Sequence, residues 1–154
     1  MRFFSRLFSR NKVDCPRCLG KGDVDPEDIK RLRKELYWVP GKCAYCNGAG
    51  KVSSKRVSTI HPGTEYLTTD LAKGEREKLL HGDKGALQRA KEHQAEIEKI
   101  LQLIEHLYYI ENQEAEQIAD YLLGEYKILE NSPGERQEIM DYVETVIASK
   151  LTGK

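Results

Sequence analysis

The C-terminal half of the chain has the spacing of hydrophobic residues that is typical of helices. Downstream of Thr68, apolar side chains recur every three or four positions and so gather on one face of each segment. This pattern predicts helices over residues 70–82, 85–111 and 113–129. Another helix is expected after Asn131–Glu135, with Ser132 as its cap and Pro133 at its first position. Because short connections favour antiparallel neighbours, residues 67–154 are predicted to form a helical bundle.

The N-terminal half has fewer apolar positions, and one segment of it has a helical pattern. Asp25 is a suitable helix cap, Pro26 fits the first turn, and the apolar residues that follow lie on one stripe. We therefore predict a helix over residues 26–38. Residues 51–60 are compatible with a short strand or an extended arm. Residues 53–66 are expected to be a linker.

The first twelve residues combine phenylalanine, arginine and serine and contain no acidic residue. On a helical wheel Phe3, Phe4, Leu7 and Phe8 share one face, and arginines occupy the next sector. Residues 1–12 are therefore predicted to form a short basic amphipathic segment. Three roles are open for it: contact with a membrane surface, an organelle transit signal, or packing of its phenyl groups on the rest of the protein.

Composition and charge suggest two modules. The chain has 154 residues, of which 39% are hydrophobic and 32% charged, as in ordinary globular proteins. No run approaches the roughly 18 apolar residues of a membrane-spanning helix. Residues 1–66 hold 14 Lys/Arg and 7 Asp/Glu, whereas residues 67–154 hold 11 and 18, so the net charges are +7 and −7. Segments of opposite charge are expected to dock on each other or to meet different partners.

All four cysteines lie in two copies of one phrase, C-x-x-C-x-G-x-G. The copies are CPRCLGKG at Cys15–Gly22 and CAYCNGAG at Cys43–Gly50. Two cysteines separated by two residues can reach one metal ion from a single tight turn, and a second such turn completes a tetrahedral site. The sequence thus predicts one structural Zn²⁺ ion. Its ligands would be Cys15, Cys18, Cys43 and Cys46. Four protein ligands leave no open position for a substrate, so a catalytic metal is not expected.

The glycines of the two phrases have a predicted role in the same site. After each second cysteine the backbone has to curl so that its N–H groups point at the sulfur atoms, and glycine tolerates such a curl. The residues concerned are Gly20, Gly22, Gly48 and Gly50. Four thiolates around Zn²⁺ leave two negative charges, which the neighbouring cations can offset. These cations are Arg17, Lys21, Lys42 and Lys51.

A redox-active dithiol and a set of free thiols are the alternatives to a metal site at the cysteines. A redox C-x-x-C usually opens a helix in a βαβ setting, whereas here a glycine follows each pair. Residues 13–52 also contain too few large apolar side chains for a self-sufficient core at this size. A bound metal commonly compensates for such a small core, which favours zinc.

The repeated phrase resembles the cysteine-rich domain of DnaJ-type co-chaperones, which carries four such repeats and holds two zinc ions in an extended β-hairpin-like arm. The resemblance covers about 36 of the 154 residues, Cys15–Gly50, and implies a DnaJ-like zinc module over residues 13–52 that binds one ion. The His-Pro-Asp tripeptide of a J-domain is absent, and His61–Gly63 reads His-Pro-Gly instead. What the resemblance still implies is contact with a protein partner or a non-native polypeptide.

The fold class expected from all these patterns is mostly α. An N-terminal tetracysteine zinc finger, a small irregular and β module stabilised by zinc, is followed by an antiparallel helical bundle. The expected function is that of a non-enzymatic zinc-binding adaptor or chaperone accessory. Aromatic side chains beside the cysteine turns are candidate partner contacts, with packing over the metal site as the alternative role. They are Tyr37, Trp38 and Tyr45.

A nucleic-acid-binding zinc finger that uses the basic N-terminal half is the alternative function, although the acidic half would repel the same phosphates. Enzyme signatures are missing, since the four histidines form no H-x-x-x-H pair and no phosphate-binding loop occurs. Cysteines that need a reducing compartment point to the cytoplasm. Membrane association or organelle import through residues 1–12 stays open.

Overall fold

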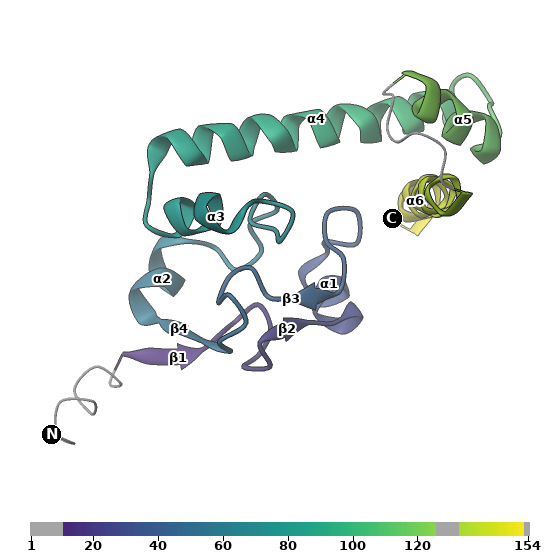
Figure 1. The fold of residues 1–154 in the computed structure, drawn as a ribbon. Helices are drawn as coiled ribbons and strands as arrows, with labels where there is room; N and C mark the ends of the chain where they lie inside the picture. The colour runs from purple at the N-terminus through teal and green to yellow at the C-terminus, as the bar shows by residue number, and fades with distance from the viewer. Residues whose placement is uncertain (1–10, 126–132, 153–154) are drawn as a thin grey trace, which may run out of the picture. The chain divides into compact units, whose positions relative to one another are not determined.

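The computed structural model describes residues 11–125 and 133–152 and is mostly helical, with a small strand module (Figure 1). The strands are β1 (Lys12–Asp14), β2 (Asp23–Val24), β3 (Gly41–Lys42) and β4 (Lys51–Ser53). The helices are α1 (Pro26–Leu32), α2 (Ser54–Thr59), α3 (Lys73–Leu80), α4 (Lys84–Tyr109), α5 (Ala115–Glu125) and α6 (Pro133–Thr152). The mostly helical class with a small β module and a tetracysteine group is thereby confirmed. The predicted amphipathic segment at residues 1–12, apart from Asn11 and Lys12, and the Ser132 cap lie outside the described residues.

The chain divides into two compact units, with the boundary between Gln94 and Ala95. The expected boundary lay near residue 67, with a linker over residues 53–66. The difference arises because apolar residues beyond position 66 pack into the same core as the cysteines. They include Leu67, Leu79, Ala86 and Ala90, all of them buried. α3 and the start of α4 therefore belong with the cysteine-containing unit, and a single bundle over residues 67–154 is not confirmed.

Four short strands frame the cysteine turns in two antiparallel pairs. β1 pairs with β4, where Val13 lies opposite Val52, and β2 pairs with β3, where Asp23 lies opposite Lys42. The first cysteine turn connects β1 to β2, and the second connects β3 to β4. Each turn is consequently bound at both ends to the strands of the other turn. Residues 51–60, which the sequence left undecided between a strand and an arm, contain β4 and then the helix α2.

Helix α1 begins as the sequence indicates but ends earlier. Asp25 caps it in a capping box, since its side chain accepts from the Asp28 N–H and the Asp28 side chain accepts from the Asp25 N–H. The predicted end at residue 38 is wrong, because the helix stops at Leu32. Arg33 takes a left-handed conformation, with φ of 55°, and the chain then turns toward Trp38.

Helices α3 and α4 are joined by a tight turn. α3 starts at Lys73, later than the pattern suggested, and no side chain caps its first turn. Asp83 then caps α4, since its Oδ1 accepts a hydrogen bond of 2.7 Å from the Ala86 N–H. An ion pair between Arg89 and Glu75 also holds α4 to α3.

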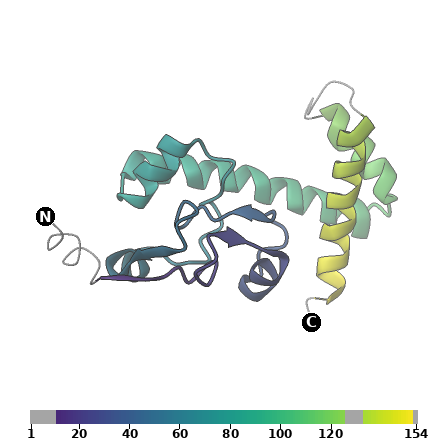
Figure 2. The same cartoon turned by 60° about the horizontal axis from the view of Figure 1, so that its bottom comes forward.

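The second unit contains the C-terminal part of α4 together with α5 and α6. Helices α5 and α6 pack side by side (Figure 2). Its core is aliphatic, as the sequence stripe indicated. The most deeply buried side chains are Ile104, Ile118, Ala119, Val143 and Val146. Among the described helices of either unit, none has the length and apolar character needed to cross a membrane.

Candidate metal centre

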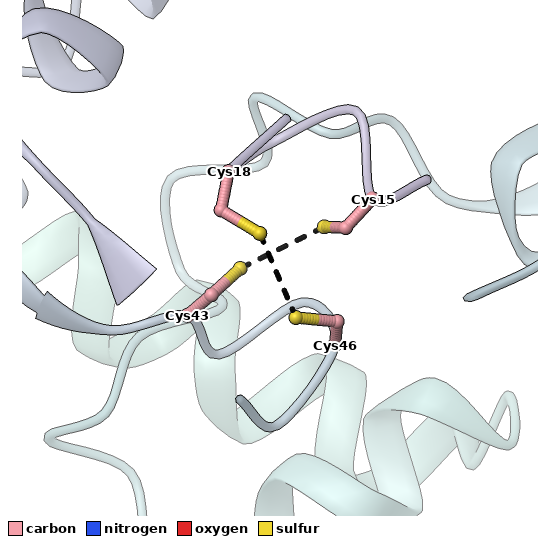
Figure 3. A group of neighbouring side chains, drawn as sticks. All are labelled: Cys15, Cys18, Cys43 and Cys46. Atoms are coloured by element: carbon pink, nitrogen blue, oxygen red, sulfur yellow. Dashed lines mark hydrogen bonds between the residues drawn. The ribbon is translucent and has the colours of Figure 1, made fainter. Parts of the chain in front are cut away.

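The four cysteine sulfur atoms lie together in the core of the first unit. Figure 3 shows them directed at a common centre from two separate turns, with the contacts Cys15–Cys43 and Cys18–Cys46 crossing. Both of these Sγ–Sγ distances are 3.8 Å, and all four sulfurs lie within 4.8 Å of one another. A disulfide needs about 2.05 Å, so all four residues are free thiols. A tetrahedral ion with bonds of about 2.3 Å separates its sulfur ligands by about 3.8 Å, so the group is positioned to hold a metal ion.

The two turns are related by an approximate twofold symmetry and are fastened to each other through their backbones. The Cys15 N–H donates to the Gly50 carbonyl at 2.8 Å, and the Cys43 N–H donates to the Gly22 carbonyl at 2.9 Å. Positions that correspond in the two phrases therefore make corresponding bonds. As a result, main-chain hydrogen bonds help to fix the sulfur atoms of one turn relative to those of the other.

Backbone N–H groups also point at two of the sulfur atoms. The Gly22 N–H donates to Cys18 Sγ at 3.2 Å, and the Gly50 N–H donates to Cys46 Sγ at 3.3 Å. Gly22 has a φ of +87°, and a Cβ there would lie 2.6 Å from the Gly48 carbonyl oxygen. Because the backbones of the two turns come so close at this point, only glycine fits at position 22. Such N–H donors stabilise thiolates and would spread the negative charge of a metal–thiolate cluster.

Burial and mutual hydrogen bonds shift the pKa values of the individual thiols in different directions. A hydrogen bond from Cys43 lowers the pKa of Cys15 to about 5, against the opposing effect of burial. The same bond, followed by burial, raises the pKa of Cys43. Burial raises the pKa of Cys18 to about 11. Cys18 and Cys43 thus resist ionisation, and a nearby cation such as a bound metal ion would favour their thiolate forms.

Arg17, inside the first C-x-x-C, is the functional residue whose role the sequence analysis missed. Its side chain is only 2% exposed. The guanidinium donates to three carbonyl groups of one later segment: Nε to Pro62 at 2.7 Å, Nη1 to Leu67 at 2.6 Å and Nη2 to Thr64 at 3.0 Å. It also lies over the Trp38 ring, 4.1 Å from the ring centroid. Arg17 thus ties residues 62–67 to the cysteine turn.

Tyr45 occupies the equivalent position in the second C-x-x-C and also hydrogen-bonds to the segment that follows α2. Its hydroxyl donates to the Ile60 carbonyl at 2.7 Å, and the side chain is fully buried. Trp38 is 8% exposed, and its Nε1 donates to the Glu65 carbonyl at 3.1 Å. Neither aromatic is available as a surface contact, so burial favours the alternative role of packing over the metal site. Tyr37 is half-buried against the same core.

Arginines also hold the carbonyl groups inside the two cysteine turns. Arg31 Nη2 donates to the Arg17 carbonyl at 2.8 Å, and Arg56 Nη1 donates to the Tyr45 carbonyl at 3.0 Å. Arg31 also pairs with the buried Asp28 at 3.0 Å. This pairing links α1 to the first turn. Both turns are thus supported from outside by a guanidinium on a neighbouring helix.

The lysines that the sequence placed near the cluster mostly have carboxylate partners of their own. Lys21 pairs with Asp25 and, at 2.8 Å, with Asp28. Lys51 pairs with Asp14 at 2.7 Å. Arg17, by contrast, is buried: burial lowers its pKa to about 10, and attraction to Cys43 and Cys15 partly opposes this lowering.

Comparisons of the chain with protein-family models, with curated proteins and with solved structures find no match. The geometry of the site is therefore the basis of any functional conclusion. Within residues 11–125 and 133–152, the four cysteines are the one cluster of His, Cys, Asp or Glu side chains positioned around a common metal centre.

Proposed function

We propose that this protein is a non-enzymatic zinc-binding adaptor or chaperone accessory, which contacts a protein partner or a non-native polypeptide through a DnaJ-like cysteine-rich module. The observation that carries the proposal is the closed group of four buried cysteines, whose sulfurs lie within 4.8 Å of one another. A centre enclosed by four protein ligands has no position for a substrate. Such a centre has a structural role: it fixes the conformation of the surrounding surface.

Zinc is the metal that we assign to this centre, as one ion per chain. A tetrahedral set of four thiolates suits Zn²⁺ or iron. In a reducing compartment Zn²⁺ adds no redox chemistry and serves as a structural ion. Cys15, Cys18, Cys43 and Cys46 would be its ligands. An iron-loaded centre would be coloured, so metal analysis and an absorption spectrum separate the two.

The resemblance to the DnaJ cysteine-rich domain gains support from the local geometry. Each C-x-x-C-x-G-x-G phrase forms a turn between short antiparallel strands, and two phrases together surround one centre. The difference is the insertion of helix α1 between the phrases. We carry over from the family the contact with polypeptides and nothing of its ATPase stimulation.

We assign the partner surface on the module to exposed apolar side chains, because Trp38 and Tyr45 are buried. Leu19 directly follows the second cysteine, Val39 lies in the loop before β3, and Val13 lies in β1; all three are exposed. Exposed aliphatic groups on a rigid support suit weak contacts with unfolded chains.

The alternative of nucleic-acid binding loses support from the pairing of basic side chains. Lys34 contacts Glu65, Arg31 pairs with Asp28, and Lys51 pairs with Asp14. Cations that are already paired within the protein release fewer counterions on binding to phosphates. A binding assay across salt concentrations tests this directly, since nucleic-acid binding would weaken steeply as salt rises.

Metal analysis of the purified full chain tests the zinc assignment. We expect about one zinc ion per wild-type chain and a large loss in Cys43→Ser, because three remaining thiolates leave the centre open. Ala148→Ser, which adds a hydroxyl at an exposed site in the second unit, is the control and should retain zinc. A wild-type chain with no metal, or a Cys43→Ser chain with full zinc, would refute the assignment.

A separate experiment tests the adaptor role. The zinc-loaded chain should slow the aggregation of a denatured model client, as followed by light scattering, and Leu19→Ser with Val39→Ser should weaken this effect while zinc content stays unchanged. Failure of the wild type to slow aggregation, together with failure to capture any partner from cell extract, would reject this role and leave the zinc assignment intact.

A further inference from the structure

A cavity of about 730 Å³ lies within the first unit, beside the core that contains the cysteines. It is open to solvent on one side and lined by α2, by residues 60–67 and by the turn between α3 and α4. Pockets that bind small molecules usually have volumes of about 300–1,000 Å³. The metal centre does not contribute a lining residue to it, so it is a second site with chemistry of its own.

The two sides of the cavity differ in chemical character. α2 and the segment after it contribute polar and basic side chains, among them Lys55, Arg56 and His61. α3 and α4 contribute mainly leucines, among them Leu80 and Leu87, which pack against the core below. A lining that contains both apolar and basic side chains suits an amphiphilic molecule with a negative head.

The basic wall has positive charge and hydrogen-bond donors available for a ligand. Within the described parts of the chain, Lys55 lies within ion-pair distance of no carboxylate, and its side chain is exposed. His61 accepts the Gly63 N–H on Nδ1 at 3.0 Å, so the neutral ring carries its proton on Nε2 and can donate it. The lining carboxylate, Asp83, is already engaged in capping α4. Asp83 keeps its negative charge, but Lys55 and Arg56 outnumber it, so the lining has a net positive charge and favours an anion.

The wall formed by residues 60–67 is held in place from behind. The Ile60 carbonyl accepts the Tyr45 hydroxyl, and the Leu67 carbonyl accepts Arg17 Nη1. Both donors come from the middle of the cysteine turns. Because this wall is fixed by buried hydrogen bonds, the cavity is formed before any ligand arrives, which lowers the entropic cost of binding.

We propose that this cavity binds a small anionic amphiphile, with an unbranched or aromatic apolar part against Leu80 and Leu87 and a carboxylate or phosphate head at Lys55 and His61. The volume, the leucine side, Lys55, which is unpaired among the described residues, and the donor of His61 together support this class of ligand. The binding site goes beyond the adaptor role and does not depend on the partner surface around Leu19 and Val39.

A fluorescence titration tests the proposal. Dansyl-labelled undecanoate, kept below its micelle concentration, is added to the zinc-loaded full chain, and its emission is followed to saturation. Unlabelled dodecanoate and dodecyl phosphate are competitors that distinguish the two head groups, and dodecanol is the neutral competitor. We expect the anions to displace the probe at least about tenfold more effectively than the alcohol, because a partly desolvated charge pair contributes on that scale.

Charge reversal at the basic wall supplies the variant. Lys55→Glu should weaken probe binding by about tenfold, since it replaces an attraction with a repulsion. Lys91→Glu, on the exposed side of α4 and outside the lining, has the same change in charge and should leave binding unchanged. Leu80→Gln should weaken binding of the probe and of dodecanol alike. Absence of saturable binding, equal displacement by dodecanol, or equal effects of Lys55→Glu and Lys91→Glu would each overturn the proposal.

Discussion

Removal of the Arg17 side chain is the sharpest test of how the first unit is held together. The guanidinium is buried and donates to the carbonyls of Pro62, Thr64 and Leu67, some 45–50 residues further along the chain. Arg17→Ala leaves these three acceptors without their donor and takes a cation from the face of the Trp38 ring. Arg17→Lys keeps the charge but cannot reach three carbonyls with one ammonium group.

The expected loss of stability follows from opposing contributions. Three hydrogen bonds from a charged donor contribute about 1.5–3 kcal/mol each, which gives about 4.5–9 kcal/mol in total. Burial of the guanidinium opposes this. With the attraction to the cysteine sulfurs partly offsetting it, burial leaves the pKa of Arg17 lowered from 12.5 to about 10, a net cost of about 3 kcal/mol. We therefore expect Arg17→Ala to reduce the free energy of unfolding by about 3 kcal/mol, within the range measured when one partner of a buried charged network is removed.

Urea unfolding followed by tryptophan fluorescence measures this loss. Trp38 is the single tryptophan of the chain and lies directly beneath Arg17, so its emission reports on the region concerned. Both variants are compared at equal zinc content. Lys30→Ala removes one exposed positive charge from α1 and should change stability by less than about 0.5 kcal/mol. If Arg17→Ala were no more destabilising than Lys30→Ala, the three hydrogen bonds would not stabilise the unit as inferred.

Two further variants test the turns and the α1 network. Gly22→Ala should reduce the free energy of unfolding by more than about 1 kcal/mol, because its Cβ would lie 2.6 Å from the Gly48 oxygen. The control is Gly74→Ala, in open space on α3, which should be neutral or stabilising. Equal effects of the two substitutions on stability would contradict the reasoning. For Asp28, burial raises the pKa, but hydrogen bonds from Lys21 and Arg31 outweigh it and hold the pKa below its usual value. The stability that wild type has over Asp28→Asn should be complete above about pH 4 and decline as the pH falls through that lowered pKa; an advantage that is constant with pH would argue against the ion pairs.

The grouping of the four cysteines could be predicted from the sequence because each C-x-x-C turn is a local feature. Two residues between cysteines fix the distance that each turn spans, and the glycine after each pair marks the curl of the backbone. The capping box of α1 was equally readable, since Asp25 and Asp28 lie three residues apart. Within each turn and in the capping box, the residues that interact are close together in the chain. The contacts between the two turns, such as Cys15–Cys43, span 28 residues and were inferred from the repeated phrase.

The boundary of the first unit was not predictable, because it depends on contacts over long separations. The spacing of Leu67, Leu79 and Ala90 fits a helical bundle as well as it fits packing on the cysteine module. Nothing in the sequence around Arg17 indicates that its acceptors lie beyond position 60. The early end of α1 depends on a left-handed Arg33, a conformation that helix propensity does not reveal.

The pairing of the first strand with the last one in the module has a consequence for synthesis on the ribosome. β1 pairs with β4, and the Arg17 guanidinium donates to carbonyls as far along the chain as Leu67. A nascent chain that ends before these residues therefore lacks both the partner strand of β1 and the acceptors of Arg17. The nascent first unit can close only after its last contact has left the exit tunnel. Until then its four thiols are exposed to the metals and oxidants of the surrounding solution.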